Sequence, residues 1–132
     1  MRYLVTGSQM RAIDQDTIQN IGIPSLVLME RAAECVARKA EQLCDQKTLQ
    51  ILAICGVGNN GADGVAAARM LYLHGFDVLV VVVGNEAHAT KEFEVQKGIA
   101  EKLEIPVVDW EHFLHGEDEQ KAGDCAIIDA VF

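Results

Sequence analysis

Residues 56–64 are the part of the sequence whose residue types most clearly suggest chemistry, because they read Gly-Val-Gly-Asn-Asn-Gly-Ala-Asp-Gly. This segment contains the pattern G-x-G-x-x-G, with which many α/β proteins bind the phosphates of a dinucleotide. Its glycines allow a tight turn, and the unpaired N–H groups at the start of a following helix attract an anion. A plain tight turn, in which the asparagines bond to their own backbone, is the alternative. The preceding apolar run favours the phosphate-binding interpretation.

Three polar side chains inside this segment, those of Asn59, Asn60 and Asp63, exceed what phosphate binding requires. Amide and carboxylate oxygens suit a hard cation, and a helix start stabilises a nearby carboxylate as an anion. A conventional dinucleotide-binding fold would instead need an acid after the second strand to hold a ribose, and Glu86 is the available residue. The segment therefore suggests either a cation site or an acid–base group beside a nucleotide.

Asp129 is the second polar landmark, because it follows the apolar residues 126–128 near the end of the chain. Neighbouring parallel strands end at the same edge of a sheet, so Asp129 lies near Asn60 and Asp63 if the last strand pairs with the first. Alternatively, this aspartate caps the turn after its strand. Both interpretations remain open on the sequence alone.

Alternating helices and strands are expected to position these residues. Such alternation predicts a parallel sheet with right-handed crossovers, and therefore a Rossmann-like three-layer α/β/α sandwich in which residues 1–132 form one domain. Two N-terminal helices should cover part of the sheet. Four strands make a small sheet, and we expect the domain to be incomplete at its C-terminal end. The predicted helices span residues 8–20 (capped by Ser8), 25–43, 62–74 and 90–103, and the strands span residues 49–55, 77–84, 105–109 and 124–132.

Composition excludes several classes of protein. The chain has 132 residues, half of them hydrophobic, which suffices for one core but not two. Its 11 basic and 20 acidic residues give a net charge of −9, which disfavours binding to nucleic acid or to anionic lipid. The longest aliphatic run, residues 78–83, is far too short to cross a bilayer. We expect a cytoplasmic protein, since no signal peptide is visible.

The cysteines and histidines show no spacing typical of a metal site. We expect the four cysteines to be buried, reduced thiols and the four histidines to lie at the surface. There is no G-x-S-x-G nucleophile motif for acyl transfer. The residues concerned are Cys35, Cys44, Cys55, Cys125, His74, His88, His112 and His115.

Three stretches together make the sequence similar to the NAD(P)H-hydrate epimerase family, whose domain is also called the YjeF N-terminal domain. They are residues 9–14 with 22–30, residues 56–64 with 67–69, and residues 128–132. The resemblance implies an isomerase that repairs damaged cofactors by interconverting the C6 epimers of hydrated NADH and NADPH. It also implies a possible dehydratase domain fused beyond this chain.

The resemblance assigns roles to individual residues. Asn59, Asn60, Gly61, Ala62 and Asp63 would contact the hydrated cofactor. Asn60 and Asp129 would bind a potassium ion. Epimerisation needs proton transfer to and from a departing atom, and Asp129 or Asp63 would supply or position that acid.

Three departures from the family pattern bear on these roles. Ala62 replaces a glycine, Arg31 replaces an asparagine, and Ala33–Glu34 stands where a glycine is expected. The glycine-rich loop and the strands that follow the Asp-Ala-x-Phe stretch in the family are absent from this sequence. Part of the pocket is therefore expected to be missing.

Two other functions are kept open. One is a non-catalytic interaction module, since this fold also occurs in mRNA-decapping scaffolds; the other is a conventional NAD-binding domain. The substrate is expected to be a small molecule, and the chain is expected to form a homodimer or higher oligomer because an open strand edge tends to pair.

Overall fold

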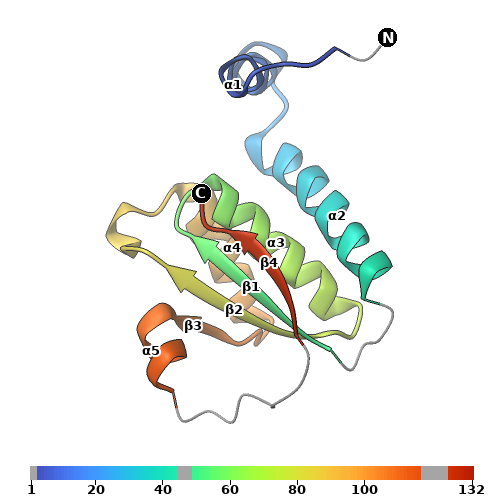
Figure 1. Ribbon diagram of the computed structural model, residues 1–132. Helices are drawn as coiled ribbons and strands as arrows, with labels where there is room; N and C mark the ends of the chain where they lie inside the picture. Colours follow the sequence, from blue (N-terminus) through green and yellow to red (C-terminus); the bar gives the residue numbers. More distant parts are fainter. Residues whose placement is uncertain (1–2, 45–48, 117–124) are drawn as a thin grey trace.

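A four-stranded parallel sheet lies at the centre of the computed structural model, which describes residues 3–44, 49–116 and 125–132. The strand order is β3-β2-β1-β4, and all three pairings are parallel (Figure 1). This order confirms the predicted parallel sheet and places the last strand beside the first. The strands are β1 (Gln50–Gly56), β2 (Asp77–Val83), β3 (Val107–Asp109) and β4 (Cys125–Ala130).

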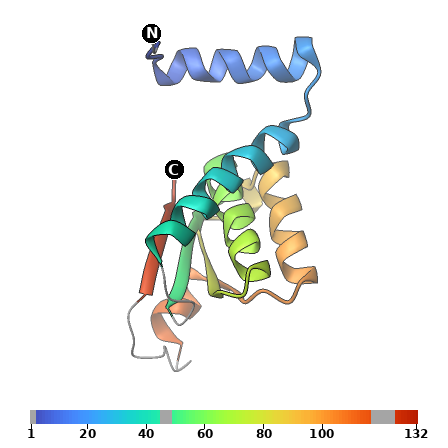
Figure 2. The ribbon, with the colours of Figure 1, turned by 90° about the vertical axis from the view of Figure 1, so that its right-hand side faces the viewer.

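Helices lie on both faces of this sheet, which confirms the three-layer sandwich. Val78, Val80 and Val82 of β2 point into the main core, where α3 and α4 pack. Leu79, from the opposite face of β2, lines a cavity with residues of α5. Figure 2 shows α2, α3 and α4 stacked on one side of the strands. The helices are α1 (Gly7–Asp16), a π-helical turn (Thr17–Ile21), α2 (Ser25–Leu43), α3 (Asn59–Leu73), a 3₁₀ turn (Glu86–His88), α4 (Lys91–Lys102) and α5 (Trp110–His115).

The core forms where α3 packs against the sheet. The small side chains of Ala62, Ala66 and Ala67 are fully buried and let α3 approach the strands closely. The two central strands, β1 and β2, are nearly continuous apolar runs, as expected for a parallel sheet with both faces covered. Phe93 of α4 fills the layer beside α3 and is 0% exposed.

α2 is held on α3 by an apolar stripe and by one polar cluster. Met29, Ala33 and Ala37 are buried against the core. Glu30 accepts a hydrogen bond from Arg69 Nη2 of α3 and lies 3.5 Å from Gln96 Nε2 of α4. A single carboxylate therefore joins α2 to both neighbouring helices.

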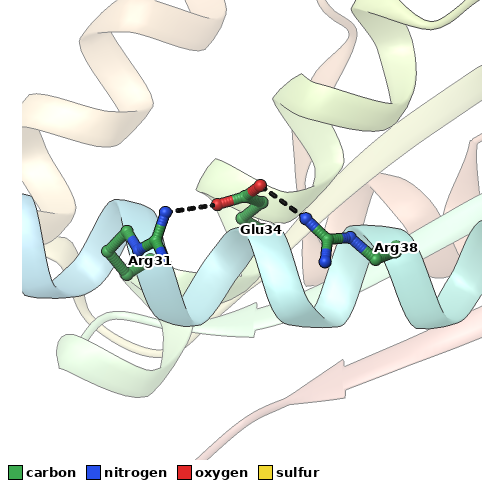
Figure 3. Close-up of polar contacts among 3 residues, drawn as sticks. All are labelled: Arg31, Glu34 and Arg38. Carbon is green, nitrogen blue, oxygen red and sulfur yellow. Dashed lines mark hydrogen bonds and ion pairs between the residues drawn. The ribbon is translucent and has the colours of Figure 1, made fainter.

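The solvent face of α2 carries a different set of charges. Glu34 accepts from Arg31 Nη1 at 3.3 Å and from Arg38 Nη2 at 2.7 Å (Figure 3). The side chains of Arg31 and Arg38 are mostly exposed. The arginine that departs from the family pattern therefore lies at the surface and pairs within its own helix.

The N-terminal helix α1 differs from the prediction in its cap and in its packing. Thr6, not Ser8, caps it: Thr6 Oγ1 accepts from Gln9 N, and Gln9 Oε1 accepts from Thr6 N at 2.8 Å. All its residues are exposed, so the expectation that both N-terminal helices cover the sheet is wrong for α1. Gly22, with φ of 90°, turns the chain before α2, and α1 stands off beyond the carboxyl end of the strands (Figures 1 and 2).

Other predictions need smaller corrections. α3 begins at Asn59 rather than Ala62, and residues 110–115, for which no helix was predicted, form α5, because Asp109 caps a helix there. Cys44 and Cys55 are buried as predicted, but Cys35 and Cys125 are exposed because they lie on the outer side of α2 and on the edge strand. The remaining boundaries differ from the predicted ones by a few residues at most. The four histidines lie at the surface as predicted.

Candidate functional site

The turn from β1 into α3 forms the centre of the candidate site. Gly58 is the extended N-cap residue, and α3 begins immediately with Asn59 and Asn60, which are both exposed. Ala62 N donates to Gly58 O at 3.0 Å, so the helical bonding begins there. The N–H groups of a helix that precede this first bond have no partner within the helix, which creates the anion-attracting start that the sequence predicted.

Two glycines of the segment allow α3 to pack tightly on the strand ends. A Cβ on Gly61 would overlap the backbone of Gly56. A Cβ on Gly64 would lie 2.6 Å from Ala130 Cβ and 2.9 Å from Cys55 Sγ. These glycines therefore serve close helix–strand packing, which is the role of the third glycine in the dinucleotide-binding pattern.

The predicted ligand-contacting residues differ in their accessibility. Asn59 and Asn60 are exposed, Asp63 is half-buried, and Gly61 and Ala62 are buried. The methyl group that distinguishes Ala62 from a glycine lies in the core, at 0% exposure. A molecule above the turn therefore meets the side chains of Asn59, Asn60 and Asp63 first.

Asp63 has the electrostatics of an acid catalyst. Burial, together with the negative charge of Asp14 on α1, raises the pKa of Asp63 to about 6. A carboxyl group with such a pKa carries a proton in a substantial fraction of molecules close to neutral pH. The sequence identified Asp63, but it did not identify Asp14, because nothing in the chain indicated where α1 would lie.

Asp129 lies at the same edge of the sheet but on the other face. It pairs with Ile54 of β1, so the last strand does neighbour the first. Ala126 and Ile128 pack toward the core and Ala130 is buried in it, whereas Asp129, which alternates with them, is exposed on the face away from α3. Its Oδ1 accepts from Val131 N at 3.3 Å, as in the turn-capping alternative.

The two candidate metal ligands, Asn60 and Asp129, therefore lie at the same edge of the sheet but do not form one cluster. Asn60 starts α3 on the inner face, and Asp129 projects from the outer face. Within residues 3–44, 49–116 and 125–132, no group of three or more histidine, cysteine, aspartate or glutamate side chains is arranged to hold a metal ion.

A further cavity opens at the carboxyl ends of β2 and β3. Its volume is about 320 Å³, and it was not foreseen from the sequence. The signal that could have revealed it is the single tryptophan of the chain, which directly follows a predicted strand. The cavity is lined by Val82, Val83, Gly84, Asp109, Trp110, Glu111 and His112.

Glu86, the candidate ribose ligand of a conventional NAD-binding domain, is engaged elsewhere. Its carboxylate lies 2.5 Å from Lys97 Nζ of α4. That contact raises the pKa of Lys97 above its ordinary value. This pairing weakens the conventional dinucleotide interpretation.

None of the helices within the described residues is long and apolar enough to span a bilayer.

Comparisons with known proteins show which proteins this chain resembles. The family model described as "YjeF-related protein N-terminus" matches residues 25–132. A protein of Limosilactobacillus fermentum named NAD(P)H-hydrate epimerase is 44% identical over 128 residues, which cover 97% of this chain and 58% of that protein. A protein of Oenococcus oeni with the same name is 36% identical over 128 residues, again 97% of this chain and 58% of the relative. The chain thus spans little more than half the length of these relatives.

A solved structure shows the same fold. The crystal structure of the yeast protein ynu0, YNL200c, matches with a TM-score of 0.80 and 24% sequence identity, covering 99% of this chain and 57% of the yeast chain. The fold of this chain is therefore also found in an experimentally determined structure.

Proposed function

This chain belongs to the YjeF-related protein N-terminus family, and from that premise we propose that it acts as an NAD(P)H-hydrate epimerase, by itself or as part of a longer protein. The observation that carries the proposal is the 44% identity over 97% of the chain to a relative with that name. The exposed asparagines at the start of α3 and the raised pKa of Asp63 supply suitable chemistry at one place.

The turn between β1 and α3 is the proposed contact surface for the hydrated cofactor, through Asn59, Asn60, Gly61, Ala62 and Asp63. The unpaired N–H groups at the start of α3 suit a phosphate oxygen. The amide side chains of Asn59 and Asn60 can both donate and accept hydrogen bonds, as sugar hydroxyls and a carboxamide require.

Asp63 is the better candidate for the acid, and Asp129 is the alternative. In the hydrated cofactor, C6 carries both the ring nitrogen and a hydroxyl group, so inversion requires one of these bonds to break and re-form from the other face. There are two possible routes. If the C–N bond breaks, the hydroxyl group loses its proton as C=O forms, and the ring nitrogen gains a proton. If the C–O bond breaks instead, the hydroxyl group gains a proton and leaves as water. Closure reverses each transfer, so one carboxyl group is regenerated in every cycle.

A potassium ion held by Asn60 and Asp129 is part of the proposal. Both residues offer oxygen ligands, which suit a hard cation. Since the two side chains lie on opposite faces of the sheet, an ion bound by both would have to lie above the ends of β1 and β4. Potassium should raise the melting temperature of the chain, and Asp129→Ala should abolish that increase.

The proposed setting is a cytoplasmic homodimer or higher oligomer. Four free cysteines suit a reducing compartment. The position of β4 at the end of the strand order leaves one of its edges for a further strand or a second copy.

The direct test is epimerisation of a single purified C6 epimer of hydrated NADH, followed by chromatographic separation of the two epimers. We expect the wild-type chain to equilibrate them, Asp63→Asn to lose most of the rate, and Asp16→Asn, an exposed change on α1, to keep it. A rate equal to that of buffer alone would overturn the proposal for this chain. Strong preference for binding native NAD over the hydrated form would indicate the conventional NAD-binding alternative.

A further inference from the structure

We propose that the cavity at the ends of β2 and β3 binds the adenine ring of the cofactor, with Trp110 as the stacking surface. This inference rests on the proposed function, because it assigns one part of that ligand to a place that the family resemblance leaves without a role. It is argued from strand register, from the exposed ring and from the charges around the cavity.

The strand register places Trp110 level with the start of the candidate site. Gly56 of β1 pairs with Val83 of β2, and Val82 pairs with Asp109 of β3. Trp110, the next residue after Asp109, therefore follows at the level of Gly56, two strands away. Two strand spacings amount to about 10 Å. A nucleoside phosphate can cover that span with its phosphate at the start of α3 and its base at Trp110.

The Trp110 ring is partly covered and packs against Phe113. It is 38% exposed, and its centroid lies 5.8 Å from that of Phe113. Asp109 caps α5 by accepting from His112 N at 2.7 Å, and its second oxygen lies 2.5 Å from His112 Nδ1. These bonds fix the first turn of α5, so the indole loses little conformational entropy when a ligand stacks on it. Aromatic rings of this kind stack on any base.

The charge of the cavity selects the end of the ligand that enters it. Asp109 and Glu111 place two carboxylates in the lining. Hydrogen bonds from the backbone and ring of His112 hold the pKa of Asp109 below its ordinary value, so this group stays ionised. Carboxylates repel phosphate but accept hydrogen bonds from ribose hydroxyls and from the adenine amino group. The neutral adenosine end therefore belongs here, and the phosphates belong at the start of α3.

Gly84 and Val57 bring the cavity close to the β1–α3 turn. Gly84 has φ of 119°, directly follows β2 and lines the cavity. A Cβ at this position would reach 3.6 Å from Val57, the residue that leads into Gly58 and α3. The cavity and the β1–α3 turn are thus adjacent along one edge of the sheet.

Trp110 fluorescence gives a direct test, because no other tryptophan contributes to the signal. The full chain is titrated with adenosine monophosphate and, separately, with ribose 5-phosphate, which lacks the base. We expect saturable quenching by the first and none by the second. Equal behaviour of the two ligands, or no binding of adenosine monophosphate by fluorescence and calorimetry, would overturn the inference.

Three variants separate stacking from general loss of structure. Measured by calorimetry, Trp110→Leu should weaken binding of adenosine monophosphate about tenfold, which equals about 1.4 kcal/mol. Trp110→Phe should retain most of the affinity, and Leu114→Ala, an exposed change in the same helix, should leave it unchanged. An affinity in Trp110→Leu equal to that of wild type would contradict the proposal.

The epimerisation assay distinguishes a failure of this inference from a failure of the proposed function. We expect Trp110→Leu to raise KM for hydrated NADH with little change in kcat, whereas Asp63→Asn lowers kcat. Quenching that depends on the base, without any epimerisation, would support the adenine site and contradict the proposed epimerase activity. Epimerisation with the same KM in wild type and in Trp110→Leu would support the proposed epimerase activity and contradict the adenine site.

Discussion

The carboxyl group of Asp63 combines burial with a neighbouring negative charge, and both favour its protonated form. If this group is the acid, kcat/KM should be highest below pH of about 6 and fall as Asp63 loses its proton. Asp14→Asn removes the neighbouring charge, so it should lower the pKa of Asp63 and move the fall in rate to lower pH. A pH–rate profile, together with carbon NMR titration of the Asp63 carboxyl, measures both shifts. Unchanged profiles in Asp14→Asn would rule out the electrostatic coupling.

The same raised pKa predicts that Asp63→Asn stabilises the fold, although the substitution lowers the rate. The pKa of about 6 in the folded chain exceeds the ordinary aspartate value of 3.8, so wild-type stability should fall as pH rises between these values. Asp63→Asn removes that cost and should stabilise the fold by about 1–2 kcal/mol at pH 7, a figure reduced because the group is half exposed. Urea unfolding at pH 4 and pH 7 tests it. An advantage of the variant that is as large at pH 4 as at pH 7 would contradict this origin.

Sequence reasoning at this scale proposed residues within motifs and passed over residues whose role depends on packing. Asn59, Asn60 and Asp63 were predicted as site residues because a glycine pattern surrounds them, and they stay a prediction. Asp14 was missed because its position depends on the turn at Gly22, and Trp110 was missed as a site residue because a three-residue strand followed by a six-residue helix has too little periodicity to be read. Asp129 lies on the face of the sheet away from α3 because of the register of β4, which the sequence does not specify.

At the scale of elements, α2 offers a matched pair of glutamates one turn apart. Glu30 contacts Arg69, whose side chain is only 14% exposed, whereas Glu34 pairs with two exposed arginines. Glu30→Ala should destabilise the protein by about 1–3 kcal/mol, because it leaves a largely buried guanidinium poorly paired. Glu34→Ala should cost about 0.5 kcal/mol or less. Urea unfolding of both variants measures the difference, and equal losses would show that the cluster of Glu30, Arg69 and Gln96 has no special role.

Two glycines in helices provide a second matched pair. A methyl group on Gly64 would collide with Ala130 and Cys55 at the strand ends, whereas one on Gly98 of α4 would meet nothing within 4 Å. Gly64→Ala should therefore destabilise by about 2 kcal/mol or more, since α3 must move away from the sheet. Gly98→Ala should stabilise by about 0.5–1 kcal/mol through helix propensity and a less flexible unfolded chain. Thermal unfolding of the two variants in parallel checks the signs, and stabilisation by Gly64→Ala would contradict the packing described here.

Most elements were predictable because their signals are local and strong. Continuous apolar runs marked β1 and β2, and Thr90 with Gly75 marked helix ends. The exact start of α3 was not predictable, because Asn59 and Asn60 favour turns as readily as a first helical turn. α5 was not predicted for a different reason: its six residues, Trp-Glu-His-Phe-Leu-His, are too few to show a repeated helical period.

At the scale of the whole molecule, the parallel sandwich followed from alternating strands and helices together with the right-handed crossover rule. The strand order could be narrowed but not fixed from the sequence, because nothing local states that β4 pairs with β1 rather than with β3. The detachment of α1 was not predictable either, since its apolar stripe implied a packed helix.

The edge strand β4 predicts self-association of this chain. Ile127 is 60% exposed on that strand, and an uncovered edge with apolar side chains invites pairing between copies. Light scattering should show a mass that rises with protein concentration, and Ile127→Lys should shift the equilibrium toward monomer. A concentration-independent monomer for the wild-type chain would contradict the expectation.

The helix α1 combines a well-formed capping box with the complete exposure of its ten residues. Its helical state therefore depends on local bonds, and a helix this short is only marginally stable in water on such bonds alone. Amide protons of α1 should consequently exchange with heavy water many times faster than those of α3, whose opening requires disruption of the entire core. The chain would then contain two levels of protection along one polypeptide, with the change between them in the few residues around Gly22.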